Sequence, residues 1–110
     1  MRGTEQEPQK PSEARLRKMI EEATVDCYNE SEQITGFFTM IDDNLEVPFE
    51  TVVLGVATVV EHIDLTSDDV ITAICSRSGH RQRIPILELP LPNPAPKGAE
   101  WIEAYRRWAR

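Results

Sequence analysis

The spacing of apolar residues changes at Pro48, and this change constrains the fold more than any other feature of the chain. Upstream, apolar residues recur at intervals of three and four, which is typical of a helix with one buried face. The clearest such run consists of Ile34, Phe37, Phe38 and Ile41. Downstream, the chain becomes rich in valine, isoleucine and threonine, which favour strands. Helices followed by strands predict an α+β fold.

Two helices are expected in the first half of the chain. Ser12 is a suitable N-cap for the first. Asn29, with Glu32 three residues later, forms a capping box for the second, which should end near residues 43–44. Gly36 costs this helix about 1 kcal/mol relative to alanine, so it indicates close packing at that position. The apolar face of the first helix would consist of Leu16, Met19, Ile20 and Ala23.

Four short strands are expected in the second half. Gly55 marks the first turn, Ser78 and Gly79 mark a hairpin, and residues 64–69 form a polar loop. Pro85 falls within the last strand, so this strand should lie at an edge or contain a bulge. We expect a small, strongly twisted antiparallel sheet, for which a partly closed SH3-like barrel is a candidate arrangement. The predicted strands are residues 49–54, 57–65, 70–75 and 81–89.

The C-terminal part combines a linker with an aromatic helix. Prolines at every second position from 90 to 96 predict a stiff, extended linker. The short helix that follows has one aromatic face, which we expect to dock on the core. The alternative is that this face anchors a partner protein. Its residues are Trp101, Ile102, Tyr105 and Trp108.

The length of 110 residues allows for one domain. We expect it to span residues 12–110, behind a disordered arm at residues 1–11. No apolar run approaches the ~18 residues of a membrane span, and the N-terminal residues lack the apolar stretch of a signal peptide. Cys27 and Cys75 are expected to be reduced, buried thiols. These features predict a monomeric, cytoplasmic protein.

The charge distribution argues against nucleic acid as a partner. The net charge is −7, whereas binding to a phosphate backbone requires a basic surface. Residues 26–69 carry eleven acidic side chains and no lysine or arginine, while residues 70–110 carry seven bases and three acids. The middle segment alone therefore makes the protein acidic.

Catalytic motifs are absent from the sequence. There is no Gly-x-Ser-x-Gly, no His-Glu-x-x-His and no P-loop. His62 falls in a predicted strand and His80 beside a turn, so no pattern places an acid, a base and a nucleophile together. A Cys–His dyad is the one catalytic arrangement left open. We therefore do not expect an enzyme.

The acidic residues gather in three clusters that suit calcium, which takes six to eight oxygen ligands. The clusters lie between the two helices, at the end of the second helix, and in the polar loop. None is an EF-hand, because glycine is missing at the sixth position and glutamate at the twelfth. The candidate ligands are Asp26 and Glu30 of the first cluster, Asp42, Asp43 and Glu46 of the second, and Asp64, Asp68 and Asp69 of the third.

A solvated acidic surface is the more common explanation of such clusters. The lack of local bases shifts the balance, because like charges repel one another and strain the fold. A bound divalent cation, or the basic C-terminal part folded against the acids, would relieve this repulsion. The helix dipole also disfavours Asp42 and Asp43 at a helix end, and calcium would turn this place into a favourable one. The acids of the loop could complete the shell if the loop folds against that helix end.

A stretch of 25 residues, DCYNESEQITGFFTMIDDNLEVPFE at 26–50, resembles the CcbP family of cyanobacterial calcium-binding proteins. Similar short stretches are LGV at 54–56, IDL at 63–65, RQRIPILELPL at 81–91 and GAEWIEAY at 98–105. The resemblance covers roughly residues 15–108, and GFFTMIDDNLEVPFE is its most specific part. In cyanobacteria it implies a small cytosolic protein that sequesters calcium and keeps the free ion low before heterocyst differentiation.

The leading hypothesis is therefore a protein that binds calcium and buffers or senses the ion in the cytosol. The alternative is a protein-interaction module. Its acidic middle segment would face a basic protein partner, or its Trp-bearing C-terminal helix would dock in a groove.

Overall fold

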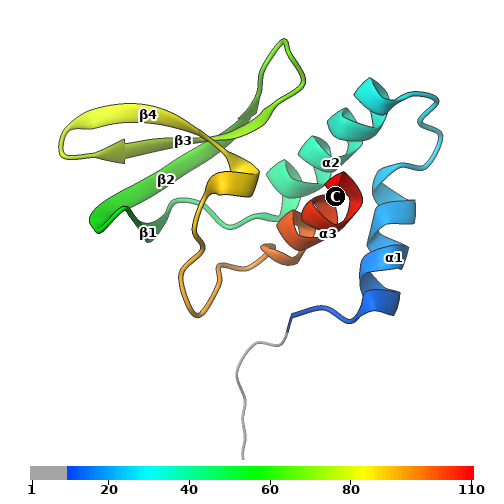
Figure 1. The fold of residues 1–110 in the computed structure, drawn as a ribbon, viewed down its shortest axis with the longest axis horizontal. Helices are drawn as coiled ribbons and strands as arrows, with labels where there is room; N and C mark the ends of the chain where they lie inside the picture. The colour runs from blue at the N-terminus through cyan, green and yellow to red at the C-terminus, as the bar shows by residue number, and fades with distance from the viewer. Residues whose placement is uncertain (1–9) are drawn as a thin grey trace, which may run out of the picture.

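The computed structural model describes residues 10–110 and places a group of helices against a four-stranded sheet (Figure 1). The predicted α+β fold is confirmed. Of the predicted disordered arm, residues 1–9 lie outside the described part. The elements are α1 (Glu13–Ala23), α2 (Glu30–Asn44), β1 (Phe49–Val53), β2 (Val56–Leu65), β3 (Ile71–Arg77), β4 (His80–Pro85), a 3-10 turn η1 (Ile86–Glu88) and α3 (Glu100–Ala109).

The first two helices start where the sequence predicts. Ser12 Oγ accepts a hydrogen bond from the N–H of Arg15 (3.1 Å) at the start of α1. At the start of α2, Asn29 Oδ1 accepts from the N–H of Glu32 (2.8 Å). The Glu32 carboxylate accepts in return from the N–H of Tyr28 (2.6 Å), one residue earlier than in the usual capping box. No helix among residues 10–110 has both the length and the apolar character needed to cross a membrane.

A glycine allows α1 and α2 to approach each other closely. A Cβ atom on Gly36 would overlap the backbone carbonyl oxygen of Ala23, the last residue of α1. The close packing that the sequence predicts at this position is therefore confirmed. Alanine would favour the helix itself, but it would separate α2 from α1.

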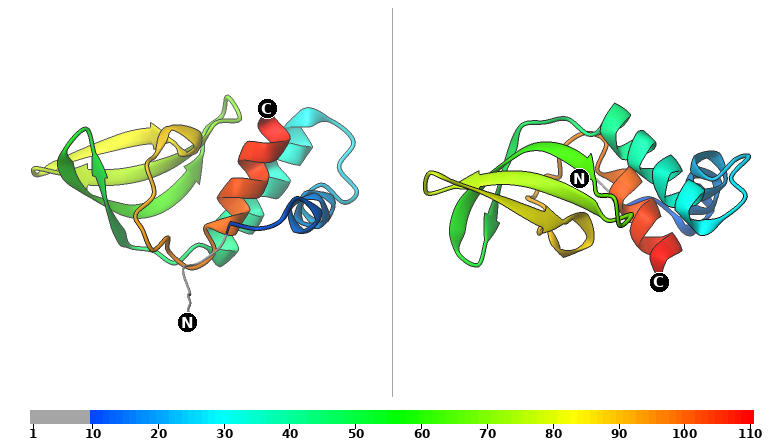
Figure 2. Two further views of the ribbon diagram at one scale, coloured as in Figure 1. Left: turned by 60° about the horizontal axis from the view of Figure 1, so that its bottom comes forward. Right: turned by 90° about the horizontal axis from the view of Figure 1, so that it is seen from above.

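The sheet is antiparallel with strand order β1-β2-β3-β4, and it is open (Figure 2). The SH3-like barrel is therefore wrong. Closure would require β4 to pair with β1, but β4 ends at Pro85, which has no N–H for a ladder and begins the 3-10 turn. For the same reason the predicted strand does not continue to residue 89. β4 is an edge strand, as Pro85 indicates, whereas the bulge lies in β2, between Val60 and His62.

The core lies between the sheet and the helices, and the aromatic face of α3 forms part of it. The ring of Phe37 from α2 packs against Tyr105 and Trp108, with centroid distances of 5.3 and 5.2 Å. Trp101 is only 8% exposed. Of the two interpretations of this face, docking on the core is confirmed.

The segment before α3 is attached to the C-terminal end of α2. The carbonyl of Lys97 accepts a hydrogen bond from the N–H of Glu46 (2.8 Å). Gly98, with a left-handed φ of 90°, lies so close to the carbonyl of Asn44 that a Cβ atom would overlap it. Only glycine satisfies both conditions. This contact fixes where α2 ends and where α3 begins.

Candidate metal centre

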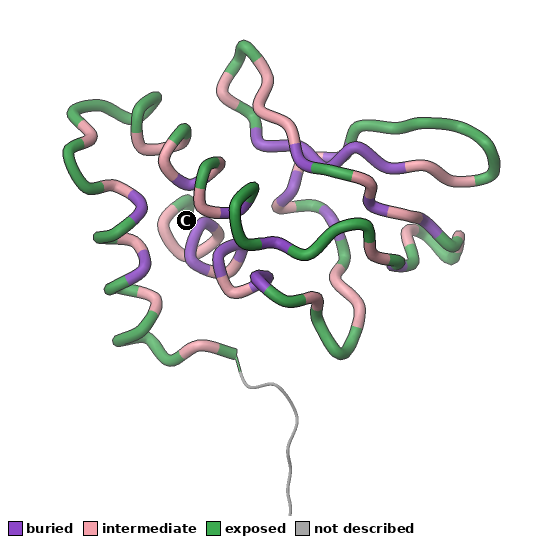
Figure 3. Tube along the Cα trace, turned by 180° about the vertical axis from the view of Figure 1, so that it is seen from behind, coloured by how far each residue is buried: buried purple, intermediate pink, exposed green. Residues whose placement is uncertain are grey.

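The first acidic cluster lies in the connection between α1 and α2, which is mostly exposed (Figure 3). Asp26 adopts a left-handed conformation with φ 60°, and Glu30 is the first residue of α2. Both side chains are exposed. Because the Glu32 carboxylate already accepts the N–H of Tyr28, the cluster offers Asp26 and Glu30 as its free carboxylates.

The second cluster surrounds the C-terminal end of α2. Asp42 and Asp43 are exposed in the last turn, which contains no basic residue, and Glu46 follows the C-cap residue Leu45. The N–H of Glu46 donates to Lys97 and not back to α2, and Pro48 has no N–H to donate. Carbonyl oxygens of the last turn therefore keep free lone pairs in the same short segment that carries Asp42, Asp43 and Glu46.

The third cluster is divided between a strand and a turn. The predicted loop at residues 64–69 is shorter in the structure, because β2 stays paired with β3 up to Leu65. Asp64 therefore lies in a strand, where its Oδ2 accepts a hydrogen bond from Arg83 Nη1 (2.7 Å). The turn itself is organised by Thr66, whose hydroxyl accepts the N–H of Asp68 (3.2 Å).

The turn between β2 and β3 lies on the side of the start of α2 and the C-terminal end of α3 (Figures 1 and 2). The pKa of Tyr105 in α3 reflects this arrangement. Burial raises it most, and the negative charges of Asp69 in the turn and Glu30 in α2 raise it further. Asp68 and Asp69 therefore do not complete a shell around Asp42 in this structure. The fold brings them toward the first cluster instead.

The eight predicted ligands are spread over these separate places. Within residues 10–110, no three His, Cys, Asp or Glu side chains lie close enough to hold a metal ion by themselves. Calcium also binds backbone carbonyls and water, so two or three carboxylates next to free carbonyls suit its chemistry. The C-terminal end of α2 carries both carboxylates and free carbonyls in one short segment. The assignment of the individual side chains as ligands stays a prediction.

The basic C-terminal part relieves only some of the repulsion among the acids. Arg81 pairs with Glu61 and Arg83 with Asp64, each at 2.7 Å. A hydrogen bond from Ser76 and the charge of Arg81 lower the pKa of Glu61, and the hydrogen bond from Arg83 lowers the pKa of Asp64. The other nine acids of residues 26–69 form no ion pair within the part of the chain that the structure describes. Sequence reasoning missed both pairs, although two arginines spaced by two in a strand share one face.

Substitution Asp64→Asn tests the pair with Arg83 through its pH dependence. The pKa of Asp64 is lowered in the folded protein. The pair therefore stabilises the fold fully at pH values above the ordinary carboxyl pKa of 3.8. This contribution is lost as the pH falls through the lower, folded-state pKa. We expect the free energy of unfolding of parent and variant to differ at neutral pH and to converge in acid, as measured by urea unfolding. A difference that stays constant with pH, or that molar salt leaves unchanged, would contradict this role.

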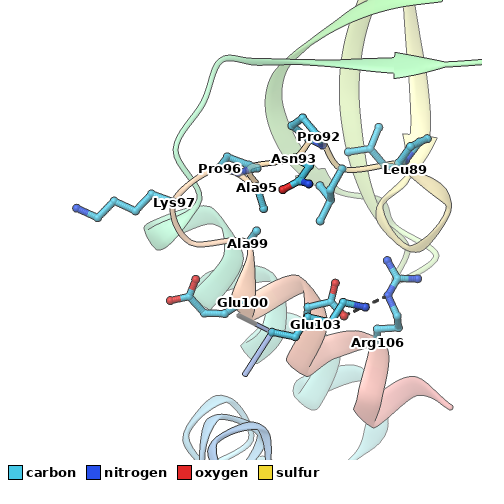
Figure 4. Close-up of a pocket in the computed structure, with 13 residues that line it drawn as sticks. Leu89, Pro92, Asn93, Ala95, Pro96, Lys97, Ala99, Glu100, Glu103 and Arg106 are labelled. Carbon is cyan, nitrogen blue, oxygen red and sulfur yellow. Dashed lines mark ion pairs between the residues drawn. The ribbon is translucent and has the colours of Figure 1, made fainter. Parts of the chain in front are cut away.

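A cleft of about 620 Å³ lies elsewhere, between the proline-rich segment and α3 (Figure 4). On its α3 side Glu103 and Arg106 form an ion pair at 3.8 Å, and Arg106 also donates to the carbonyl of Leu87 (3.0 Å). None of the eight predicted calcium ligands lines this cleft. It is therefore separate from the candidate metal centre.

Comparison with known proteins places these clusters in a family. No curated protein and no solved structure matches this chain. The model of the CcbP family, whose description is "Calcium binding", matches residues 17–109. This range contains α2, α3, the whole sheet and all three acidic clusters. The family that the sequence resembles is confirmed, and the chain belongs to the CcbP family of calcium-binding proteins.

Proposed function

We propose that this chain binds calcium without catalysing a reaction, and that it buffers or senses the ion in the cytoplasm through its acidic clusters. The observation that carries the proposal is the C-terminal end of α2. There Asp42, Asp43 and Glu46 lie next to free backbone carbonyls and form no ion pair within residues 10–110. Membership of a calcium-binding family supports the choice of ion.

The electrostatics of this helix end favour a divalent cation. The helix dipole places partial negative charge at the C-terminal end of α2, and the carboxylates of the last turn add to it. A bound dication would therefore offset both the partial charge of the helix dipole and the charge of the carboxylates. All donors at this place are oxygens, which suits calcium and does not suit zinc.

The contacts that hold the C-terminal end of α2 in place favour buffering over sensing. The carbonyl of Lys97 and the close contact of Gly98 with Asn44 hold the end of α2 in place. A site on a preformed support loads without a large rearrangement, and calcium buffers change shape less than calcium sensors do. We therefore infer that storage of the ion is the main role.

Calcium is expected to raise the melting temperature. An ion that binds only the folded state stabilises it by about 2.7 kcal/mol at a hundredfold excess over Kd. For a domain of this size such a gain corresponds to roughly 10 °C. Thermal unfolding followed by tryptophan fluorescence, in calcium and in a chelator, measures the effect, and magnesium at equal ionic strength is the control.

Equal melting temperatures in chelator and in millimolar calcium would overturn the proposal. Calorimetry then separates it from the alternative. An interaction module gives no heat with calcium, but it binds a basic protein partner that salt releases.

A further inference from the structure

Apart from Glu13 in the first turn, the charges of α1 run in the order that its own dipole disfavours. Arg15, Arg17 and Lys18 lie in its first half, whereas Glu21 and Glu22 lie in its second half. Anions are preferred near the start of a helix and cations near its end. Lys18 and Glu22 have the i, i+4 spacing in the less favourable orientation, and they form no ion pair within the described residues. Within one copy Arg15 pairs with Glu100 of α3 at 3.8 Å. Lys18, Glu21 and Glu22 form no ion pair among the described residues, so the fold of one copy gives no reason for the order of these three charges.

Four of these charged residues line a groove along the exposed side of α1, namely Arg15, Lys18, Glu21 and Glu22. The groove has a volume of about 750 Å³. Arg15 and Lys18 lie toward one end of it, and Glu21 and Glu22 toward the other. Its apolar lining includes Trp101 from α3 and Val25, whose side chain follows α1 and is 66% exposed. Basic, apolar and acidic groups thus share one surface.

We propose that this groove pairs with the same groove of a second copy of this chain, with the two α1 helices antiparallel. A two-fold axis across the middle of α1 brings Arg15 and Lys18 of one copy against Glu21 and Glu22 of the other, twice in one interface. A parallel arrangement would oppose like charges. The antiparallel pair also covers Val25, which one copy leaves in water.

The occupant is a second copy because the surface complements itself. A purely basic partner would meet Arg15 and Lys18, and a purely acidic one would meet Glu21 and Glu22. A partner with both signs in the reverse order fits, and the chain carries that order itself. α1 lies on the flank of the helices farthest from the sheet, so pairing leaves the C-terminal end of α2 open (Figures 1 and 2). This proposal differs from the monomer that the sequence analysis predicts.

Single charge reversals on α1 test this arrangement. Lys18→Glu places like charges against Glu22 of the partner copy, and we expect it to raise the Kd of the dimer by about tenfold or more. Arg17→Glu is the matched control, since it makes the same charge change at a neighbouring exposed position outside the groove. Sedimentation velocity at low salt, with and without calcium, measures both, and circular dichroism checks that each variant is folded.

A mixture of variants gives the decisive measurement. Lys18→Glu and Glu22→Lys should each be monomeric alone, but together they should form a one-to-one dimer, because each restores the opposite charge that the other needs. A parent that stays monomeric at millimolar concentration would overturn the proposal. So would equal weakening by Arg17→Glu, or a mixture that does not dimerise. Because dimer formation by the mixture can be measured in chelator, the result is independent of the proposed calcium binding.

Discussion

Replacing Asp42 and Asp43 by asparagine is expected to weaken calcium binding by about tenfold or more. Both carboxylates lie in the last turn of α2, next to carbonyl oxygens that lack helical partners. Asparagine keeps the size and one oxygen of each side chain but removes its charge. A titration by isothermal calorimetry measures the change in affinity.

The same double substitution should raise the melting temperature of the calcium-free protein. Without the ion, each carboxylate at the negative end of the helix dipole costs about 0.3–1 kcal/mol. One change therefore moves binding and apo-stability in opposite directions, which general damage to the fold would not do. Glu88→Gln is the control, because it removes an exposed carboxylate from the 3-10 turn η1, outside all three clusters and outside α2.

Unchanged affinity in the Asp42 and Asp43 double variant would mean that the calcium site lies elsewhere. The connection between α1 and α2, with Asp26 and Glu30, is then the next candidate. The structure brings the turn that carries Asp69 toward the start of α2 (Figures 1 and 2).

Substitution Gly98→Ala is expected to destabilise the protein by about 4 kcal/mol or more, which places it among the most damaging single changes. A Cβ atom at this position would overlap the carbonyl of Asn44 and the Cα of Leu45. The positive φ of 90° adds strain for any L-residue with a side chain. Either α2 or the start of α3 must then move. Urea unfolding followed by the fluorescence of Trp101 and Trp108 measures the loss.

Gly55→Ala is the matched control for this substitution. Gly55 also has a positive φ, 78°, but no atom lies within 4 Å of the position of its Cβ. It should therefore show the cost of backbone strain alone, about 1–2 kcal/mol. Equal losses at the two glycines would mean that the contact between Gly98 and the end of α2 contributes nothing to stability.

Several elements of the fold could be predicted because their causes are local. The caps at Ser12 and Asn29 depend on side chains three residues from their partners, and the stripe around Phe37 depends on the helical repeat. The effect of Pro85 on its strand was also visible in the sequence, and in the structure β4 ends at this residue and does not continue to residue 89. Interactions between residues only a few positions apart can be predicted directly from the sequence.

The candidate site was only partly predictable, because cation ligands depend on where distant segments meet. The sequence places acids at the end of α2, and the structure adds free carbonyls there, since Glu46 donates to Lys97. The sequence does not show that Asp64 pairs with Arg83, or that the turn between β2 and β3 lies on the side of the start of α2 and not at its C-terminal end. Those outcomes depend on the register of β2 with β3 and β4 and on the packing of the sheet against the helices.

By itself the sequence determined the helices and strands, the acidic middle segment and the resemblance to a calcium-binding family. The tertiary structure alone decided which acids form no ion pair and which free backbone carbonyls lie in the same segment as the acids of α2. It also decided how charged residues of α1 line a groove with Trp101. The physical reason is the separation along the chain over which each interaction acts. Periodicity and capping act within a few residues, whereas an electrostatic site is made by groups that the packing of the core brings together from across the chain.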